Sequence, residues 1–324
     1  MPNLPTVLAT NALHPDGTAL IAPHARLVVA PDTADDTLRR LAREADGIIV
    51  RAKLPDDIFD HAPRVKGAVR HGVGLDFIPV EAATAKGIAV ANLPGCNTQS
   101  VAEYVLGALM TLRRPLASAD ATMRAKGWGA ARPLAEGFAE IGGSTLGIVG
   151  VGTIGKAIAA IARNGFGMRV LGASRSRGRM PGGVEEVTLD ELFKQADAIV
   201  VSCAMTPQNK GLVDARLIGL MKRTAVLINV SRGPVVVTGA LIKALEQGAI
   251  AGAALDVHDV QPLMPADAVF ACRNLLLTPH IAAITATSSR VMSIGSVEEM
   301  LRILRGQDPI NLANPGYRDR RGQP

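Results

Sequence analysis

At roughly 100 to 200 residues per domain, a chain of 324 residues corresponds to about two domains and can bury a core without disulfide or metal staples. A hydrophobic share of 48% and a charged share of 20% exclude a disordered, collagenous or coiled-coil chain. Aromatic residues make up only 3%, which argues against the stacking platforms that bind single-stranded nucleic acid.

The net charge of +6 does not come from a basic patch. Basic residues are scattered, and the densest group is the tail with Arg318, Arg320 and Arg321, which we interpret as a solvated chain end. We therefore expect no nucleic-acid partner, whereas an anionic small molecule would suit the charge.

Cysteine usage and hydropathy indicate a cytoplasmic protein. Cys96, Cys203 and Cys272 are odd in number and show no CxxC or His-paired spacing, so we expect neither disulfides nor a metal site. No apolar run approaches the roughly 18 residues of a membrane span, and the first residues lack the pattern of a signal peptide. We expect no membrane partner.

Short Val- and Ile-rich runs alternate with Ala- and Leu-rich stretches of helical period, a texture typical of doubly wound parallel sheets. Residues 97–112 open with cap-type polar residues and continue as a long helix that could bridge two lobes. In chain order we predict helix 33–44, strands 45–50 and 65–70, helix 100–112, strand 145–149, helix 154–164, strand 169–173, helix 189–194, strands 198–202 and 225–230, helix 239–247, and strands 251–257 and 275–278.

A glycine-rich turn lies between the strand 145–149 and the helix that follows it. Its pattern is Gly150-x-Gly152-x-x-Gly155, with Thr153 and Ile154 opening the helix. The first glycine permits the tight turn, the second lets backbone approach a pyrophosphate, and the third lets helix pack on strand. The helix N-terminus adds free N–H donors and a positive dipole. These five residues are therefore predicted to bind a dinucleotide coenzyme.

The coenzyme is predicted to be NADP(H), with NAD(H) also possible. An NAD site would place an acidic residue at the end of the second strand, to bind the ribose 2′-hydroxyl. The chain instead has Ser174, Arg175, Ser176 and Arg177 there. Two arginines and two hydroxyls suit a 2′-phosphate through charge-assisted bonds.

Long sequence blocks resemble the D-isomer-specific 2-hydroxyacid dehydrogenase family. They cover residues 70–110, 140–155, 206–236, 239–257 and 274–285, and include RHGVGLDF, LINVSRGP and LLLTPHIAAIT. The resemblance is to glyoxylate/hydroxypyruvate reductase-like members or to short phosphoglycerate dehydrogenase-like members. It implies transfer of a hydride between NADP(H) and a small 2-oxo acid or D-2-hydroxy acid.

The resemblance also implies an architecture. A flavodoxin-like substrate domain would consist of residues 1–98 and 289–324, with a Rossmann coenzyme domain, residues 99–288, inserted between them. Both would be doubly wound parallel-sheet α/β domains. Homodimers formed through the coenzyme domain are usual in this family, and we expect one here.

Reduction of a 2-oxo acid needs a cation for the carboxylate and a proton donor for the nascent alkoxide. Arg232 follows a strand, can bind carboxylate with its fork and polarise the carbonyl, and matches the family's catalytic arginine. His280 titrates near neutral pH and matches the catalytic histidine. Both are also expected to contact the substrate.

The residue expected beside the histidine departs from the family pattern. The family usually has a glutamate that raises the pKa of the histidine, and Gln261 stands at that position. A neutral amide can orient His280 but cannot stabilise imidazolium by charge, so reduction should fall off at lower pH than in Glu-bearing relatives. The alternative is that Asp259 takes the place of the glutamate. Formate dehydrogenases of this superfamily also carry Gln there.

The remaining site residues are assigned by resemblance. Asp256 resembles the ligand of the nicotinamide carboxamide, and Val230 would offer backbone to the nicotinamide side. Cys203 and Thr206 would line the adenosine side, with Cys203 as a small apolar residue and not a nucleophile.

For the substrate, Val73 and Gly74 would bind carboxylate through backbone N–H groups. His71 beside this loop is left open as a cleft residue. If Arg51 or Lys53 points into the cleft, a distal acidic group on the substrate is expected; otherwise glyoxylate or hydroxypyruvate fits better.

Two alternatives follow from the missing glutamate. One is formate-like hydride transfer without proton transfer, which would give a pH–rate profile with no histidine limb. The other is a non-enzymatic, coenzyme-sensing protein like the corepressors that resemble these dehydrogenases, which would bind NADPH without turnover.

Overall fold

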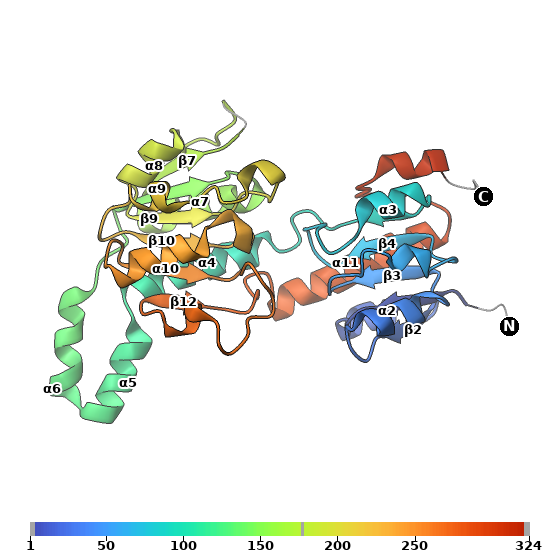
Figure 1. Cartoon of the computed structure of the whole chain (residues 1–324), viewed down its shortest axis with the longest axis horizontal. Helices are drawn as coiled ribbons and strands as arrows, with labels where there is room; N and C mark the ends of the chain where they lie inside the picture. The colour runs from blue at the N-terminus through green and yellow to red at the C-terminus, as the bar shows by residue number, and fades with distance from the viewer. Residues whose placement is uncertain (1–3, 176–177, 321–324) are drawn as a thin grey trace. The chain divides into compact units, whose positions relative to one another are not determined.

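The computed structural model describes residues 4–175 and 178–320. Contacts divide the chain into two compact units. The terminal unit is formed by residues up to Asn97 and from Ile284 onward, and the central unit by Thr98–Ala283. Figure 1 shows a sheet with helices in each unit.

The terminal unit is built on a five-stranded parallel sheet with the order β2-β1-β3-β4-β5. Its strands are short, and most of their residues are buried except in the edge strand β2, which is partly exposed. They are β1 (Thr6–Ala9), β2 (Arg26–Val29), β3 (Gly47–Val50), β4 (Gly67–Arg70) and β5 (Ala89–Ala91). The helices are α1 (Pro15–Ile21), α2 (Asp35–Ala42), η1 (Ile58–Asp60), α3 (Val80–Ala85), α11 (Ala286–Leu304) and η6 (Pro315–Arg320).

Alternation along the strands separates two cores in this unit. On β3, Ile48 and Val50 pack with residues of α2, η1 and α3, whereas Ile49 packs on the opposite face with residues of α1 and α11. Glycine lets α11 approach the sheet closely. A Cβ at Gly47 would lie 2.3 Å from Met300 Sδ, and one at Gly67 would lie 2.7 Å from Ile303 Cδ1.

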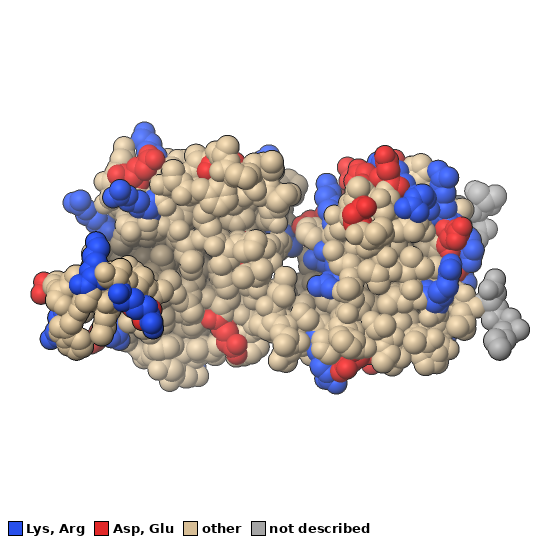
Figure 2. Space-filling model, turned by 90° about the horizontal axis from the view of Figure 1, so that it is seen from below, with Lys and Arg blue, Asp and Glu red and all other residues tan. Residues whose placement is uncertain are grey.

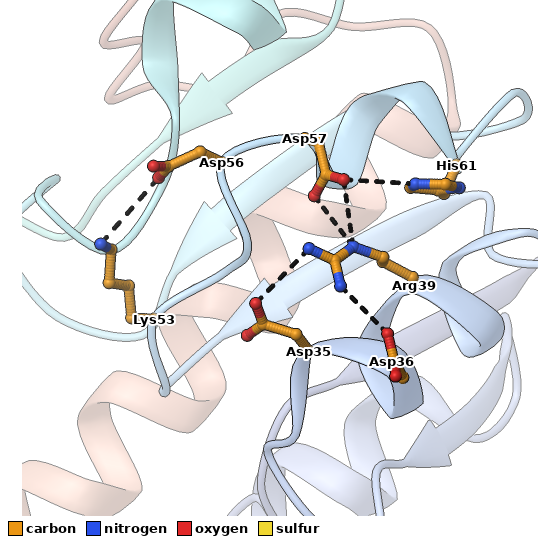
Figure 3. A network of polar contacts seen from close by, with 7 residues as sticks. All are labelled: Asp35, Asp36, Arg39, Lys53, Asp56, Asp57 and His61. Atoms are coloured by element: carbon orange, nitrogen blue, oxygen red, sulfur yellow. Dashed lines mark hydrogen bonds and ion pairs between the residues drawn. The ribbon is translucent and has the colours of Figure 1, made fainter.

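A surface ion-pair network joins α2 to the segment around η1 (Figure 3). Arg39 Nε lies 3.0 Å from Asp57 Oδ1, and the same guanidinium reaches Asp35 and Asp36. Arg39 holds the pKa of the Asp57 carboxyl below its ordinary value. His61 Nε2 lies 3.4 Å from Asp57 Oδ2. Exposed pairs of this kind contribute little to stability, and the network has no substrate-binding geometry.

The central unit has a seven-stranded parallel sheet with the order β12-β11-β10-β9-β6-β7-β8. Helices α4 and α7 cover one face, and α8, α9 and α10 cover the other. The strands are β6 (Thr145–Val149), β7 (Arg169–Ala173), β8 (Glu185–Glu186), β9 (Ala198–Val201), β10 (Val226–Asn229), β11 (Gly252–Leu255) and β12 (Leu275–Leu277). The helices are α4 (Thr98–Arg113), α7 (Thr153–Phe166), α8 (Leu189–Gln195), α9 (Ala215–Ile218) and α10 (Thr238–Glu246), with short turns η3 (Pro207–Asn209), η4 (Gly233–Val235) and η5 (Ala268–Ala271).

The strand order reverses at β6. The chain runs outward through β7 and β8, then crosses to β9 on the other side of β6. In open α/β sheets ligands bind beside the carboxyl ends of the strands at such a reversal. A coenzyme is therefore expected to bind at this edge of the sheet, beside the carboxyl ends of β6 and β9.

A helical arm projects from the central unit (Figure 1). It consists of α5 (Leu116–Lys126), α6 (Trp128–Ala131) and η2 (Arg132–Gly137), and none of these three elements contains a buried residue. Leu116, Met123 and Trp128 are 60%, 48% and 68% exposed. The arm thus presents large apolar side chains to solvent.

Two surface properties bear on possible partners. Within residues 4–175 and 178–320, no helix combines the length and apolarity needed to cross a membrane. The face drawn in Figure 2 mixes acidic and basic side chains and leaves much of the central unit without charge.

Candidate active site

The glycine-rich turn after β6 has the geometry of a pyrophosphate cradle. Gly150 has φ +92°, and a Cβ there would lie 2.4 Å from Cys203 Cα, so a side chain is excluded. A Cβ at Gly152 would meet nothing within 4 Å, which leaves space for a ligand. At Gly155 a Cβ would lie 2.6 Å from the carbonyl oxygen of Gly150, so this glycine lets α7 begin against the turn. The N-terminus of α7, with Thr153, faces the cradle region.

The turn after β7 carries the residues predicted to select the coenzyme. Ser174 is half-buried and Arg175 is exposed, and within the described part of the chain Arg175 makes no ion pair or side-chain hydrogen bond. Ser176 and Arg177 lie outside the described residues. An acid that the sequence reading missed lies nearby, since Glu186 Oε2 accepts a hydrogen bond of 2.9 Å from Gly178 N.

The segment after β9 borders the cradle. Burial raises the pKa of the Cys203 thiol, so the reactive thiolate is disfavoured at neutral pH. Thr206 caps η3 in a reciprocal arrangement, with its N–H donating to Asn209 Oδ1 at 2.8 Å. Val230, at the end of β10, donates its N–H to Val201 O at 3.1 Å. Coenzyme contacts for Cys203, Thr206 and Val230 stay predictions.

Arg232 lies in the turn that follows β10, and this turn is braced by a buried amide. Asn229, 1% exposed, accepts from Ser231 N at 3.0 Å and donates to Arg232 O at 3.1 Å. Arg232 Nη1 donates to Ser231 O at 2.8 Å. A Cβ at Gly233 would lie 2.1 Å from His258 C, so glycine brings this turn against the segment that follows β11. Asn229 was not singled out from sequence, although an Asn at the end of a strand is a typical turn residue.

His280 follows β12 and is paired with Gln261. Its Nδ1 lies 3.0 Å from Gln261 Oε1, and Gln261 Nε2 donates to His258 O at 3.4 Å. An amide oxygen only accepts, so the proton of the neutral imidazole must be on Nδ1. Asp259 has a different partner, because its Oδ2 accepts from Thr238 Oγ1 at 2.8 Å. The structure therefore pairs His280 with the amide and not with Asp259.

The backbone at His280 is left-handed, with φ +57°, and Asp256 holds it. The carboxylate of Asp256 is 2% exposed and accepts from Thr278 Oγ1 at 2.7 Å, Ile281 N at 2.7 Å and Ala282 N at 2.9 Å. His280 N donates to Asp256 O at 2.8 Å. The carboxylate thus faces the histidine loop, and the carboxamide contact predicted for it stays a prediction.

A second histidine, which the sequence reading passed over, supports the same loop. His258 is 8% exposed, and its Nε2 donates to Thr278 O at 2.9 Å. Its position two residues after Asp256, in a strand-to-loop segment, gave no signal that separated it from a surface histidine.

In the terminal unit, the Val73–Gly74 loop follows β4 and is held by its carbonyl groups. Arg70 donates to Gly74 O at 3.1 Å and to Val50 O at 2.7 Å, and its guanidinium carbon lies 4.4 Å from the centroid of the Phe77 ring. Asn92 Nδ2 donates to Val73 O at 2.7 Å. Among the described residues, the N–H groups of Val73 and Gly74 donate no hydrogen bond, which suits an incoming carboxylate.

Three other cations and bases of this unit can be placed. Arg51 donates from Nη1 to Ala12 O, and burial lowers the pKa of its guanidinium. Lys53 is 67% exposed, with Nζ 3.9 Å from Asp56 Oδ1. His71 is buried and lies 2.9 Å from Ser293 Oγ through Nε2. Burial, and then the charge of Arg51, lower the pKa of His71 to about 3, so it is neutral at physiological pH.

The arrangement in the central unit is that of an enzyme that uses a dinucleotide. Arg232, Gln261 and His280 follow the adjacent strands β10, β11 and β12, at the same carboxyl edge as the glycine cradle. Within the part of the chain described by the structure, no three His, Cys, Asp or Glu side chains gather as metal ligands would.

Comparison with known proteins supports this assignment. Residues 106–282 match the family model described as D-isomer specific 2-hydroxyacid dehydrogenase, NAD binding domain. A glyoxylate reductase of Aeropyrum pernix is 34% identical in an alignment 322 residues long that covers 96% of this chain and 96% of that one. The crystal structure of TT0316 protein from Thermus thermophilus is 32% identical, with a TM-score of 0.87 over 95% of this chain and 99% of that one. The NADPH-dependent glyoxylate/hydroxypyruvate reductase of Sinorhizobium meliloti, solved with NADP and malonate, is 28% identical, with a TM-score of 0.83 over 95% of this chain and 96% of that one.

The fold and site define an NAD(P)-dependent oxidoreductase with two parallel-sheet α/β domains. The chain belongs to the D-isomer specific 2-hydroxyacid dehydrogenase family. Its activity is the NAD(P)-dependent reduction of a 2-oxo acid. The predicted family and fold class are thereby confirmed.

Proposed function

We propose that the protein is an NADP(H)-preferring reductase of a small 2-oxo acid, in which Arg232 binds the substrate carboxylate and His280 is the proton donor. The observation that carries this proposal is the placement of both side chains after β10 and β12, the strands on either side of β11, at the edge of the sheet that holds the glycine cradle. Three elements of one chemical step are thus brought to one edge.

The substrate carboxylate would be bound by charge and by backbone dipoles. The fork of Arg232 can hold carboxylate and polarise the adjoining carbonyl, because a guanidinium offers five donors in one plane. Val73 and Gly74 would contribute their N–H groups. The carbonyl groups of these two residues already accept hydrogen bonds from Asn92 and Arg70. The bound coenzyme supplies the hydride.

His280 would give its proton to the carbonyl oxygen as negative charge develops there. Gln261 accepts from Nδ1–H, which leaves Nε2 as the nitrogen that carries the transferable proton in the imidazolium. A neutral amide orients this ring without the charge that a carboxylate would add. Reduction is therefore expected to fall off at lower pH than in relatives with glutamate.

The preference for NADP(H) is supported by the turn after β7. Ser174 and Arg175 lie where a ribose 2′-substituent is bound in this fold, with Ser176 and Arg177 next in sequence. Arg175 has its guanidinium exposed and without an ion-pair partner among the described residues, so it can meet a 2′-phosphate.

The proposal is tested by Arg232→Ala, with initial rates on glyoxylate, hydroxypyruvate, pyruvate and phosphonooxypyruvate. We expect kcat/KM to fall by about 100- to 1000-fold or more, while the dissociation constant of NADPH changes little. Arg216→Ala is the matched control, because Arg216 lies on α9 of the same unit and pairs with Asp190 at the surface. Turnover by Arg232→Ala that equals turnover by the control would refute the role of Arg232.

The same panel addresses the substrate. Arg51 donates a hydrogen bond to Ala12 O, and Lys53 is largely exposed beside Asp56. These contacts give no reason to assign either residue to a distal acidic group of the substrate. We propose glyoxylate or hydroxypyruvate as the substrate. A higher kcat/KM for phosphonooxypyruvate than for both would contradict this choice and assign Arg51 or Lys53 to the distal phosphate.

The pair of Gln261 and His280 also favours a second candidate, formate oxidation, in which a hydride moves without a proton. A pH–rate profile with no histidine limb and turnover of formate would support that reaction. Binding of NADPH with no turnover of formate or of any 2-oxo acid would instead support a coenzyme-sensing role.

We further propose a cytoplasmic homodimer formed through the central unit. The three cysteines are all free thiols, which fits a reducing compartment. The arm exposes Leu116, Met123 and Trp128 and contains no buried residue, so a second copy could cover it. Sedimentation would test the dimer: a monomer at micromolar concentration, or a dimer unaffected by Trp128→Glu, would contradict this interface.

A further inference from the structure

The carboxylate that holds the His280 loop is joined to a hydroxyl chain that begins on α4. Thr278 Oγ1 lies 2.7 Å from Asp256 Oδ1, and the phenol oxygen of Tyr104 lies 2.7 Å from the same Thr278 Oγ1. Tyr104 is 174 residues earlier in the chain than Thr278. The three side chains therefore connect a helix that packs under the sheet to the loop that carries the proton donor.

The direction of the hydrogen bonds in this chain follows from proton counting. A threonine hydroxyl has a single proton, and an ionised carboxylate can only accept. Thr278 must therefore donate to Asp256 and accept from Tyr104. Burial, and also the negative charge of Asp256, raise the pKa of Tyr104, which keeps the phenol protonated as a donor. Hydrogen bonds that run in one direction polarise and strengthen one another.

We propose that Tyr104 is a positioning residue for His280. Its hydroxyl orients Thr278 toward Asp256, and Asp256 in turn holds the N–H groups of Ile281 and Ala282 directly after the histidine. His280 needs such support because its φ of +57° is costly for a residue with a side chain. The inference rests on the proposed role of His280 as proton donor.

The first test compares Tyr104→Phe with Tyr317→Phe. The chain has only these two tyrosines, and Tyr317 likewise donates its phenol proton, in its case to the carboxylate of Asp308 in the terminal unit. Tyr104→Phe is expected to lower kcat about fivefold to tenfold, the equivalent of one hydrogen bond, with the KM for NADPH unchanged. The variant should also weaken the hydrogen bond from His280 Nδ1 to Gln261, which favours the imidazolium. The pKa of His280 should then fall, and the limb of the pH profile for reduction should move to lower pH. The control should change neither.

A double-mutant cycle separates positioning from general destabilisation. If Tyr104 acts through Thr278, Tyr104→Phe combined with Thr278→Val should be no slower than Thr278→Val alone. Thr278→Ser keeps the hydroxyl and should restore most of the activity. Additive losses, or an unmoved pH limb with kcat equal to that of the control, would overturn the proposal.

A measurement independent of activity distinguishes failure of this inference from failure of the proposed function. Amide hydrogen exchange in a peptide that covers residues 278–283 should become about fivefold faster in Tyr104→Phe and stay unchanged in Tyr317→Phe. Faster exchange with an unmoved pH limb would uphold the hydrogen-bond chain and refute His280 as the titrating donor. Unchanged exchange would refute the chain itself.

Discussion

Replacement of Gln261 by glutamate tests how His280 is controlled. In Gln261→Glu a negative charge would lie at the position of Oε1, 3.0 Å from Nδ1 of His280. An opposite charge at such a distance raises the pKa of a histidine by about 1 to 3 units. Gln261 is exposed, and the hydrogen bond from its Nε2 to His258 O is lost, so we expect the lower part of this range, about 1 unit.

The direction of the pH shift depends on which protonation state of His280 is active. A higher pKa keeps the imidazolium present to higher pH, so the limb for 2-oxo acid reduction should move up by about 1 pH unit. Oxidation of the hydroxy acid needs the neutral imidazole and should begin at correspondingly higher pH. The assay is the pH dependence of kcat/KM in both directions, at saturating coenzyme.

Asp259→Asn is the matched control for this experiment. Asp259 lies two residues before Gln261 but accepts from Thr238, so removal of its charge should leave both limbs in place. An unchanged profile in Gln261→Glu would refute the assignment of His280 as the titrating group. A shift in Asp259→Asn would show that the hydrogen bond seen with Gln261 does not decide the pKa.

Four further predictions concern the coenzyme and stability. Arg175→Ala should weaken NADPH far more than NADH in fluorescence titrations, with equal losses refuting the 2′-phosphate contact. Gly150→Ala, at φ +92° and with its Cβ 2.4 Å from Cys203 Cα, should cost about 2 to 4 kcal/mol in urea unfolding. Gly152→Ala should leave the free energy of unfolding within about 0.5 kcal/mol, because its Cβ meets no atom of the protein within 4 Å. It should weaken coenzyme binding, because the added methyl group occupies the space predicted for the pyrophosphate. The pKa of His71 is lowered to about 3 in the folded protein, whereas it is about 6.5 in the unfolded chain. Between these two values the free energy of unfolding should fall by about 1.4 kcal/mol for each pH unit of acidification. An equally steep pH dependence in His71→Gln would contradict this.

The sequence predicted the central unit better than the terminal unit. The strands Thr145–Val149 and Arg169–Ala173 have the predicted bounds, because each is a short, mostly buried apolar run with a clear turn on one side. By contrast β1, β2 and β5 were missed. They contain only three or four residues each, too few to show a clear period of their own, so pairing with neighbouring strands defines them.

The candidate site, too, was only partly predictable from the sequence. The glycine spacing pointed to Gly150 because glycine carries a local geometric meaning, whereas Arg232 was assigned through its match to the motif of the family. His258 and Tyr104, which hold the site in place, gave no such signal. Both contact Thr278, which is distant from them in sequence, and no local spacing records those contacts. Asn229 acts within its own turn and was not singled out either.

The assembly of the terminal unit from both chain ends has a consequence for biosynthesis. Helix α11 supplies Val297, Met300 and Ile303 to the core on one face of the first sheet, and Gly47 and Gly67 leave room for it. During translation these side chains leave the ribosome some 200 residues after the strands they cover. One apolar face of the sheet formed by β1 to β5 therefore stays uncovered until α11 has been synthesised. Strands β1 to β5 are thus synthesised before the central unit but covered on this face only after it, and this uncovered face is where a nascent chain would need a chaperone.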